Sequence, residues 1–299
     1  MPIKRLTKLL ISIFFLGLSG VGRAILRLLG KVGSGTCVVL YYHAVPGEHR
    51  ARFARQMDIL LQTVKPTRAD RVEPLAPGGR FAAITFDDGF QSVIDHALPE
   101  LAKREIPAAL FIVTEALGHS PNWLTESGAG ARTEKLMSLE QLQGLDSRLV
   151  TIGSHTLTHP VLPTLGEEGA RRELSESRAK LERILGREVK VFSFPHGAFN
   201  SKLVDWCRDA GYDRVFTIVP ALAFSDPREF VTGRVSVEPT DWPLEFRLKL
   251  LGAYRWLPLA FSLKRRILSI PKGFEAVKKS YPRPVAACSP KGDDIISRR

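Results

Sequence analysis

The stretch Ala83-Ile84-Thr85-Phe86-Asp87-Asp88-Gly89-Phe90 is a short apolar run that ends at two adjacent carboxylates and a glycine. Consecutive side chains of a strand point to opposite faces of the sheet, so two neighbouring aspartates can share one cavity only where the strand has ended and the chain turns. Gly89 supplies that turn. Beyond it, one carboxylate can bind a metal while the other stays free to accept a proton. The stretch therefore predicts a buried strand followed by a turn that carries chemistry, with an ordinary Asp-Gly turn as the alternative.

Strand-like and helix-like segments alternate along most of the chain around this stretch. The expected strands are β-branched or aromatic runs at 37–43, 107–113, 149–153, 189–194, 214–219 and 229–237. Segments with helical spacing of apolar residues separate them, at 53–61, 91–104, 164–185 and 199–210, and Ser138 with Gln141 and Thr164 with Glu167 predict capping boxes. Strand, helix and strand in close succession indicate parallel pairing. The sequence therefore predicts an α/β barrel with its special residues at the strand ends.

Histidines of the ligand type follow a second strand end. His155 and His159 come directly after the strand 149–153, and their spacing lets two imidazoles converge on one ion. A carboxylate from Asp88 would complete a set of two histidines and one aspartate that leaves positions open for water. A single His-x-x-x-His spacing often occurs by chance. Ligand and proton-transfer residues at several separate strand ends, with His43 and His196 among them, together predict a metal-dependent site.

The composition is that of a basic globular protein. The chain has 299 residues, of which 44% are hydrophobic and 25% charged, and its formal net charge is +12. This length allows one large domain with appendages or two small domains. Basic residues are interleaved with Leu, Phe and Trp near both ends, which favours a membrane surface over a groove for DNA. The three cysteines have no ligand-type spacing, so they predict neither a disulfide framework nor a cysteine-based metal site.

The two ends of the chain differ from the barrel segment. Residues 1–8 are basic and residues 9–21 are almost wholly apolar, a profile that fits an uncleaved anchor or interfacial helix and also a cleaved signal. Residues 244–270 combine aromatic and basic side chains, and they lie either against a membrane or on the barrel. The predicted division is an N-terminal helix at 1–34, a barrel domain at 35–240, a basic amphipathic helical extension at 241–280 and a disordered tail at 281–299.

Three motifs of the chain resemble those of the polysaccharide deacetylases with the NodB homology domain, carbohydrate esterase family 4. They are Thr85-Phe86-Asp87-Asp88-Gly89, Ser154-His155-Thr156-Leu157-Thr158-His159-Pro160 and Phe192-Ser193-Phe194-Pro195-His196-Gly197, and the resemblance runs from about Val38 to Val237. It implies a distorted (β/α) barrel of about seven parallel strands. It also implies a hydrolase that removes acetyl groups from sugars with one divalent metal ion, expected to be Zn²⁺, with Co²⁺ or Ni²⁺ as alternatives. By this resemblance Asp87 is the general base, and Asp88, His155 and His159 bind the metal.

Two motifs depart from the family pattern. The third motif usually has Arg before its proline and Tyr after it, where this chain has Phe194 and His196. The backbone N–H after the proline can still stabilise an oxyanion, so His196 keeps that expected role. No histidine follows His196 to act as the family's C-terminal general acid. Instead, the run that ends at His43 resembles the circularly permuted arrangement of deacetylases of poly-N-acetylglucosamine exopolysaccharide, so His43 is the expected acid. Arg234 is a candidate partner for Asp87, with a solvated surface arginine as the alternative.

These inferences predict a metal-dependent hydrolase that removes N-acetyl groups from an N-acetylated polysaccharide or glycan. The alternatives are a deformylase or deacetylase of a lipid-linked sugar at the membrane and a catalytically silent carbohydrate-binding or assembly protein. An Asp-x-Asp phosphatase is disfavoured because Asp87 and Asp88 are adjacent, and nucleic-acid binding leaves the histidines unexplained. The expected partners are the glycan and a membrane surface, without nucleic acid. The expected location is the cell envelope, at the inner membrane or in the periplasm, and the cytoplasmic face stays open.

Overall fold

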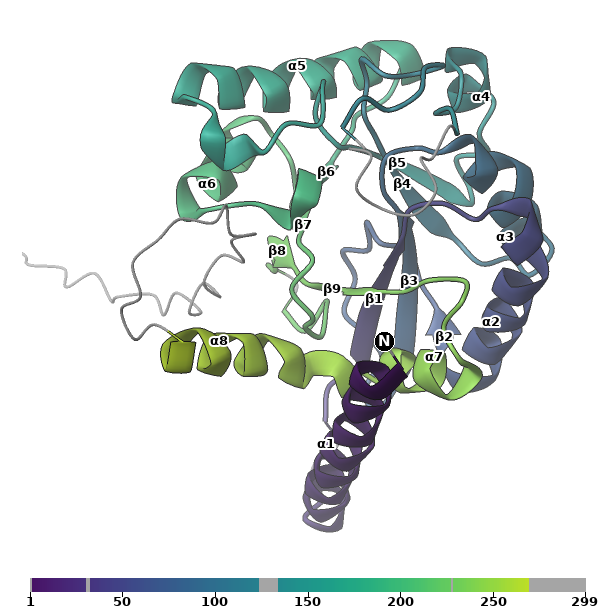
Figure 1. The fold of residues 1–299 in the computed structure, drawn as a ribbon, viewed down its shortest axis with the longest axis vertical. Helices are drawn as coiled ribbons and strands as arrows, with labels where there is room; N and C mark the ends of the chain where they lie inside the picture. The colour runs from purple at the N-terminus through teal and green to yellow at the C-terminus, as the bar shows by residue number, and fades with distance from the viewer. Residues whose placement is uncertain (1, 31–32, 124–133, 227, 269–299) are drawn as a thin grey trace, which may run out of the picture.

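Parallel strands form one sheet that curves into a barrel in the computed structural model of the chain (Figure 1). The structure describes residues 2–30, 33–123, 134–226 and 228–268. The strands are β1 (Thr36–Tyr42), β2 (Lys65–Pro66), β3 (Arg80–Phe86), β4 (Ala108–Ile112), β5 (Val150–Ser154), β6 (Val191–Ser193), β7 (Arg214–Phe216), β8 (Val231–Thr232) and β9 (Arg234–Ser236). Their order is β8-β7-β6-β5-β4-β3-β1-β9, with β2 beside β3 outside this path. Each of these strand pairings is parallel.

The segment 231–236 closes the barrel. Its first half, β8, pairs with β7, and its second half, β9, pairs with β1, so one piece of chain joins the two ends of the sheet. Gly233 lies between the two halves. Only glycine fits there, because a side chain would meet the carbonyl oxygen of Val219 and lie 2.7 Å from the Cβ of Ala221. If the segment 231–236 is counted as one strand, the barrel has seven strands in the described part of the chain. The other six are β1, β3, β4, β5, β6 and β7. The predicted α/β barrel of about seven parallel strands is confirmed.

Successive side chains of each strand alternate between the barrel interior and the layer under the helices. On β1, Val39 belongs to the interior cluster, whereas Leu40 belongs to the larger core between the strands and the helices. The interior also holds Phe111 of β4 and Phe216 of β7, whose ring centroids are 5.3 Å apart. Because side chains fill the interior, a substrate can reach the site only at the rim where the strands end.

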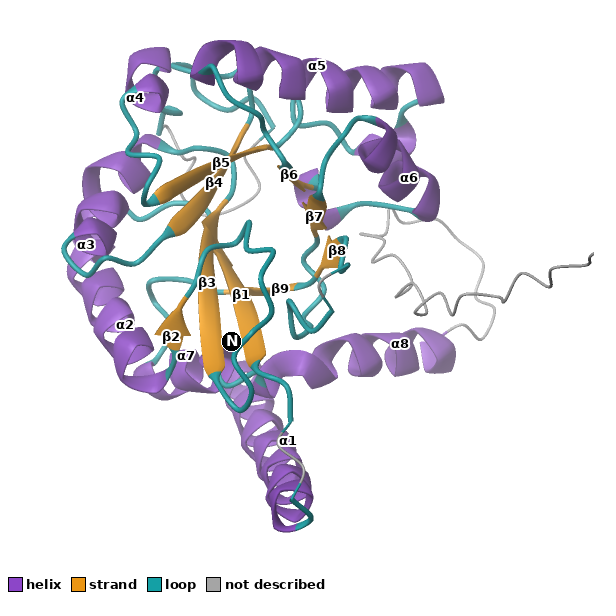
Figure 2. Ribbon diagram, turned by 180° about the vertical axis from the view of Figure 1, so that it is seen from behind, coloured by secondary structure: helices purple, strands orange, loops and turns teal. Residues whose placement is uncertain are grey.

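Helices cover the outside of the strands (Figures 1 and 2). They are α2 (Arg50–Thr63), α3 (Leu98–Ala102), α4 (Leu139–Gln143), α5 (Glu167–Leu185) and α6 (Ser201–Asp209). The expected helix at 91–104 contains a widened turn at 93–97, in which the Leu98 N–H bonds to the carbonyl of Val93. Pro99 explains the widening, since proline has no N–H and its ring crowds the preceding turn of an α-helix.

One of the two predicted helix caps is confirmed and the other is wrong. Ser138 and Gln141 form a reciprocal capping box at the start of α4. The cap predicted from Thr164 and Glu167 is absent, because α5 begins after Gly166, which provides no side-chain cap. The Thr164 hydroxyl instead donates to the carbonyl of Val161, 2.8 Å away, within a preceding 3₁₀ turn. Local sequence spacing could not foresee this turn, which ends the loop that carries the two histidines.

The terminal helices α1 (Pro2–Leu28), α7 (Pro243–Leu250) and α8 (Leu257–Leu268) gather at one end of the body, from which α1 projects (Figure 1). Residues 3–22 are long and apolar enough to cross a membrane by length and composition. In the expected extension from residue 241, Phe246 of α7 is buried in the core, whereas Leu259 of α8 is 72% exposed. The boundaries 1–34, 35–240, 241–280 and 281–299 stay predictions, and residues 269–299 lie outside the described part.

Candidate metal and catalytic site

The two aspartates lie at the turn that follows β3. Asp87 continues the inward side of the strand, and its N–H donates to the carbonyl of Tyr42 at 3.0 Å, which ties the turn to the end of β1. Asp88 and Gly89 then adopt left-handed backbone conformations with φ of 72° and 86°. Only this sharp turn lets two successive carboxylates stay on one rim, and both are buried, with 3% and 4% exposure.

Asp87 is bound by a fully buried arginine, Arg234, from the segment 231–236 that closes the barrel. Arg234 donates from Nη1 to Oδ1 at 2.7 Å and from Nη2 to Oδ2 at 2.8 Å, a two-pronged ion pair between side chains that are both buried. The same guanidinium also donates to the hydroxyls of Thr85 and Ser193. Burial raises the pKa of Asp87, but Arg234 and the nearby histidines outweigh it, so the pKa lies below its ordinary value. Asp87 is therefore ionised and rigidly oriented.

Asp88, His155 and His159 converge on one point. Asp88 Oδ1 lies 3.5 Å from Nε2 of His155 and 3.3 Å from Nε2 of His159. One ligand atom from each residue lies within 4.8 Å of the others, and all three residues are buried. The strand ends of β3 and β5 thus bring together the three residues that the sequence predicted as ligands. Their role as ligands stays a proposal.

The protonation states of this group suit a divalent cation. His155 Nδ1 lies 2.8 Å from the carbonyl oxygen of Ser193, which can only accept, so Nδ1 carries the proton and the lone pair of Nε2 points toward Asp88. Burial lowers the pKa of His155 to about 4, which leaves the ring neutral at pH 7. Burial raises the pKa of Asp88, but His159 and His155 outweigh it and hold the value at about 2. Among the described residues, Asp88 Oδ1 is buried without a hydrogen bond, which a cation would satisfy.

A glutamate of α5 fixes the loop that carries both histidines by accepting hydrogen bonds from it. Two residues of the loop, Thr156 and His159, have left-handed backbones with φ of 73° and 61°. Glu173 of α5 accepts from the backbone N–H groups of Leu157 and Thr158, at 2.8 and 3.1 Å, and from the Thr158 hydroxyl. His155 and His159, four residues apart, are therefore brought together by a strained loop rather than by a helix. Sequence analysis missed Glu173, although an acidic side chain on the apolar side of a helix, next to Leu174, was a usable signal.

The remaining predicted residues line the same rim. His43 directly follows β1 and is half-buried, with its ring edge-on to Tyr41. His196 lies in a left-handed turn after β6, exposed, with its ring edge-on to His159 at 4.4 Å between centroids. Trp123, which the sequence did not single out, stacks on the His159 ring, with 4.4 Å between the ring centroids. Aromatic rings thus enclose His159.

The structure thus combines a closed parallel barrel with an Asp-His-His group that could hold a metal ion and a buried Asp-Arg pair, all at the carboxyl ends of the strands. Residues 76–215 match the family model of the polysaccharide deacetylases. The chain is also similar to the protein named "Putative polysaccharide deacetylase YxkH" of Bacillus subtilis, with 26% identity over 212 residues, which is 67% of this chain and 71% of the relative.

Solved structures agree with this assignment. IcaB of Ammonifex degensii is 27% identical, with a TM-score of 0.57, over 72% of this chain and 97% of that chain. The polysaccharide deacetylase BC0361 of Bacillus cereus is 22% identical, with a TM-score of 0.59, over 73% of this chain and 69% of that chain, a likeness that shows the fold. Residues 76–215 therefore carry a polysaccharide deacetylase domain, and its homologues indicate a deacetylase of the hydrolase class. His43 and Arg234 lie outside the matched residues 76–215.

Proposed function

We propose that this protein is a metal-dependent deacetylase that removes N-acetyl groups from an N-acetylated glycan. The observation that carries the proposal is the convergence of Asp88, His155 and His159 beside a second carboxylate, Asp87, which Arg234 holds apart from them. One carboxylate is thereby committed to the ligand group, and the other is ionised and oriented for proton transfer. A catalytically silent carbohydrate-binding protein would have no need of this second, buried carboxylate.

The residues of the chain divide the reaction between them. Asp88, His155 and His159 would hold one divalent ion, which supplies Lewis-acid polarisation of the acetyl carbonyl and makes water more acidic. Asp87 accepts the proton of the attacking water. Because Arg234 keeps the pKa of Asp87 low, this carboxylate is a weak base, and it needs a water whose acidity has been raised.

Two histidines complete the proposed mechanism. His43 donates a proton to the leaving amine, since it stands at the end of β1, next to the strand whose turn carries Asp87. The backbone N–H of His196 donates to the carbonyl oxygen as negative charge develops there. Zn²⁺ is the metal that best suits two imidazoles and one carboxylate, and Co²⁺ or Ni²⁺ are the alternatives.

The experiment is acetate release from acetylated chitooligosaccharides by the full chain, before and after chelation and after return of Zn²⁺, with metal content measured in parallel. We expect activity to follow metal content, and His155→Ala to lose both. Glu140→Ala, on the exposed side of α4, is the matched control and should lose neither. Full activity in metal-free protein, or full metal content in His155→Ala, would contradict the proposal.

We propose further that the protein works at a membrane of the cell envelope, where a lipid-linked sugar is the second candidate substrate. The specific observation is that α1 is part of the folded body and yet presents apolar side chains to solvent. Leu9 is buried in the main core, and Ser12 accepts from Trp256 Nε1 at 2.9 Å, contacts that favour a retained helix over a cleaved signal. On the outer side, Ile3 and Phe14 are 78% and 69% exposed. Comparing initial rates on soluble and lipid-linked acetylated sugars tests this form of the proposal.

A further inference from the structure

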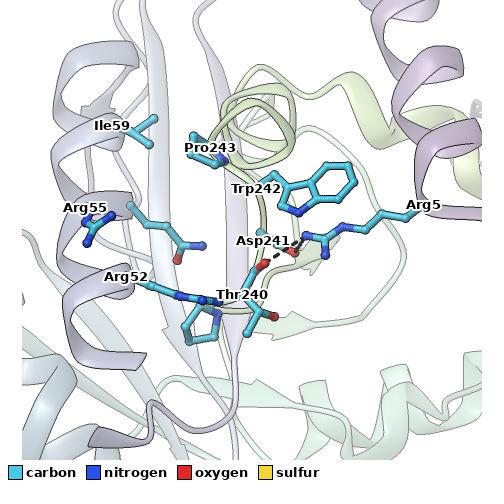
Figure 3. A pocket seen from close by; sticks show the side chains of 10 residues that line it. Arg5, Arg52, Arg55, Ile59, Thr240, Asp241, Trp242 and Pro243 are labelled. Carbon is cyan, nitrogen blue, oxygen red and sulfur yellow. Dashed lines mark hydrogen bonds and ion pairs between the residues drawn. The ribbon is translucent and has the colours of Figure 1, made fainter. Parts of the chain in front are cut away.

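A pocket of about 420 Å³ lies between the first turns of α2, the segment 239–243 and the start of α1 (Figure 3). Arg52 and Arg55 of α2 stand on one side of it, and Arg5 and Trp242 stand on the other. The pocket is outside the barrel, so it does not belong to the metal site. We propose that it binds the phosphate headgroup of an anionic membrane phospholipid. This inference rests on the membrane-bound form of the proposed function.

The charge of the pocket favours an anion. Arg52 and Arg55 are both exposed, and within the described ranges neither of them forms an ion pair or a side-chain hydrogen bond. They are three residues apart on α2, so they share one face. The acidic lining residue, Asp241, is already bound to Lys249, whose Nζ lies 2.6 Å from Oδ2. Two guanidinium groups therefore remain uncompensated, and guanidinium is the side chain whose planar fork matches phosphate oxygens.

The far wall of the pocket is preorganised. Arg5 donates to the carboxylate of Glu245 at 2.7 Å and to the carbonyl of Thr240 at 3.1 Å, so its charge is committed to the protein. Its guanidinium lies over the Trp242 ring, 4.4 Å from the centroid, and holds the indole at the mouth of the pocket. Trp242 remains 43% exposed. Tryptophan favours the headgroup level of a bilayer, where one part of the ring is apolar and the other is wet.

The pocket lies beside a helix face that suits the acyl boundary of a bilayer. Exposed apolar side chains recur along α1 at a spacing of three or four residues, next to the docked face that carries Arg5, Leu9 and Ser12. They are Ile3, Leu6, Leu10, Ile13, Phe14, Leu18 and Val21. A lipid whose acyl chains contact this face has its phosphate at the level of a polar pocket at the start of the helix.

The docked helix does not reach across a bilayer. Its first three turns are fixed to the body by Arg5, Leu9 and Ser12, which leaves residues 13–28. Sixteen helical residues span about 24 Å, less than the hydrocarbon core of about 30 Å. In this conformation α1 lies in the interface plane, which places the pocket against the headgroups rather than away from them.

The experiment is sedimentation of the full chain with vesicles of phosphatidylcholine that contain phosphatidylglycerol, at moderate salt. A basic residue near an anionic surface contributes about fivefold to binding, so Arg52→Ala with Arg55→Ala should weaken partitioning roughly 30-fold. The matched control is Arg172→Ala with Arg183→Ala, two exposed arginines of α5 at the opposite end of the body (Figure 1), which should leave partitioning nearly unchanged. Replacing Arg52 and Arg55 by lysine keeps the charge and should still weaken binding several-fold, because an ammonium lacks the planar fork.

Equal losses of vesicle binding in the pocket variant and the α5 control would overturn the inference, because the overall positive charge of the protein would then explain the binding. Release from the vesicles by acidic oligogalacturonate, without release by glycerol phosphate, would assign the pocket to a carboxylated sugar and would also overturn it. The pocket variant should keep full activity on soluble chitooligosaccharides. Conversely, Asp87→Asn should lose activity and keep vesicle binding, so failure of the headgroup site and failure of the proposed chemistry are distinguishable.

Discussion

The ion pair between Asp87 and Arg234 should be measurable as a large coupling energy in a double-mutant cycle. Both side chains are buried, with 3% and 0% exposure, and two short hydrogen bonds join them. Arg234→Met leaves the Asp87 carboxylate buried without a counter-charge. Asp87→Asn likewise leaves the Arg234 guanidinium buried without a counter-charge. Removing one partner of a buried pair costs about 3 to 5 kcal/mol. We expect each single substitution to lower the free energy of unfolding by an amount in this range.

The double variant, which combines Asp87→Asn with Arg234→Met, should be less destabilised than the sum of the two single variants. No charge remains uncompensated in it, so the interaction energy should be at least about 2 kcal/mol. Arg234→Lys keeps the charge but loses the fork, and its cost should fall between those of the parent and Arg234→Met.

The assay is urea unfolding followed by circular dichroism, with Zn²⁺ and with chelator, because bound metal adds stability of its own. Strictly additive single effects, or single effects below about 1 kcal/mol, would refute the reasoning, since the pair would then be solvated or dispensable. The matched control is the exposed pair of Arg171 with Glu167, one turn apart on α5, whose cycle should give a few tenths of a kcal/mol.

Three further predictions concern the remaining residues. Asp87→Asn should retain the metal in its folded fraction and lose roughly 10²-fold or more in deacetylation rate, and near-normal turnover would remove Asp87 from the role of base. His43→Gln should lower kcat with little change in KM, and an activated substrate with a good leaving group should restore the rate; equal losses on both substrates would contradict an acid role. Hydrogen bonds from Arg50 and then Arg104 lower the pKa of Glu100 from 4.5 to about 2, so the stability that Glu100 contributes is full above pH 5 and is lost as the pH falls toward 2. The difference in unfolding free energy between the parent and Glu100→Gln, about 1 to 2 kcal/mol at pH 7 because the partners are partly exposed, should therefore shrink at pH 3.

The strand ends were predictable from sequence, because continuous β-branched and aromatic runs indicate buried parallel strands, and a double aspartate before glycine indicates a turn where a strand ends. The same local signals placed His155 and His159 after β5. The partner of Asp87 could only be suggested, since Arg234 is 147 residues away and a strand arginine becomes buried only when the barrel closes. The wrong cap at Thr164 has a similar cause, because a spacing rule cannot show that a tertiary loop uses that hydroxyl for its own turn.

The segment 231–236, which closes the barrel, is also the last part of the barrel to be synthesised. Without the segment 231–236, strands β1 and β7 stand at opposite ends of the sheet, and among the strands that the structure describes this segment alone pairs with both. Asp87 is synthesised 147 residues before Arg234, so the carboxylate lacks this counter-ion until the segment 231–236 has been made. Closure then buries the carboxylate and supplies its counter-ion in the same step. Chains that end before Gly233 therefore carry every proposed metal ligand but lack the arginine that orients the proposed base, and we expect them to have no hydrolytic activity.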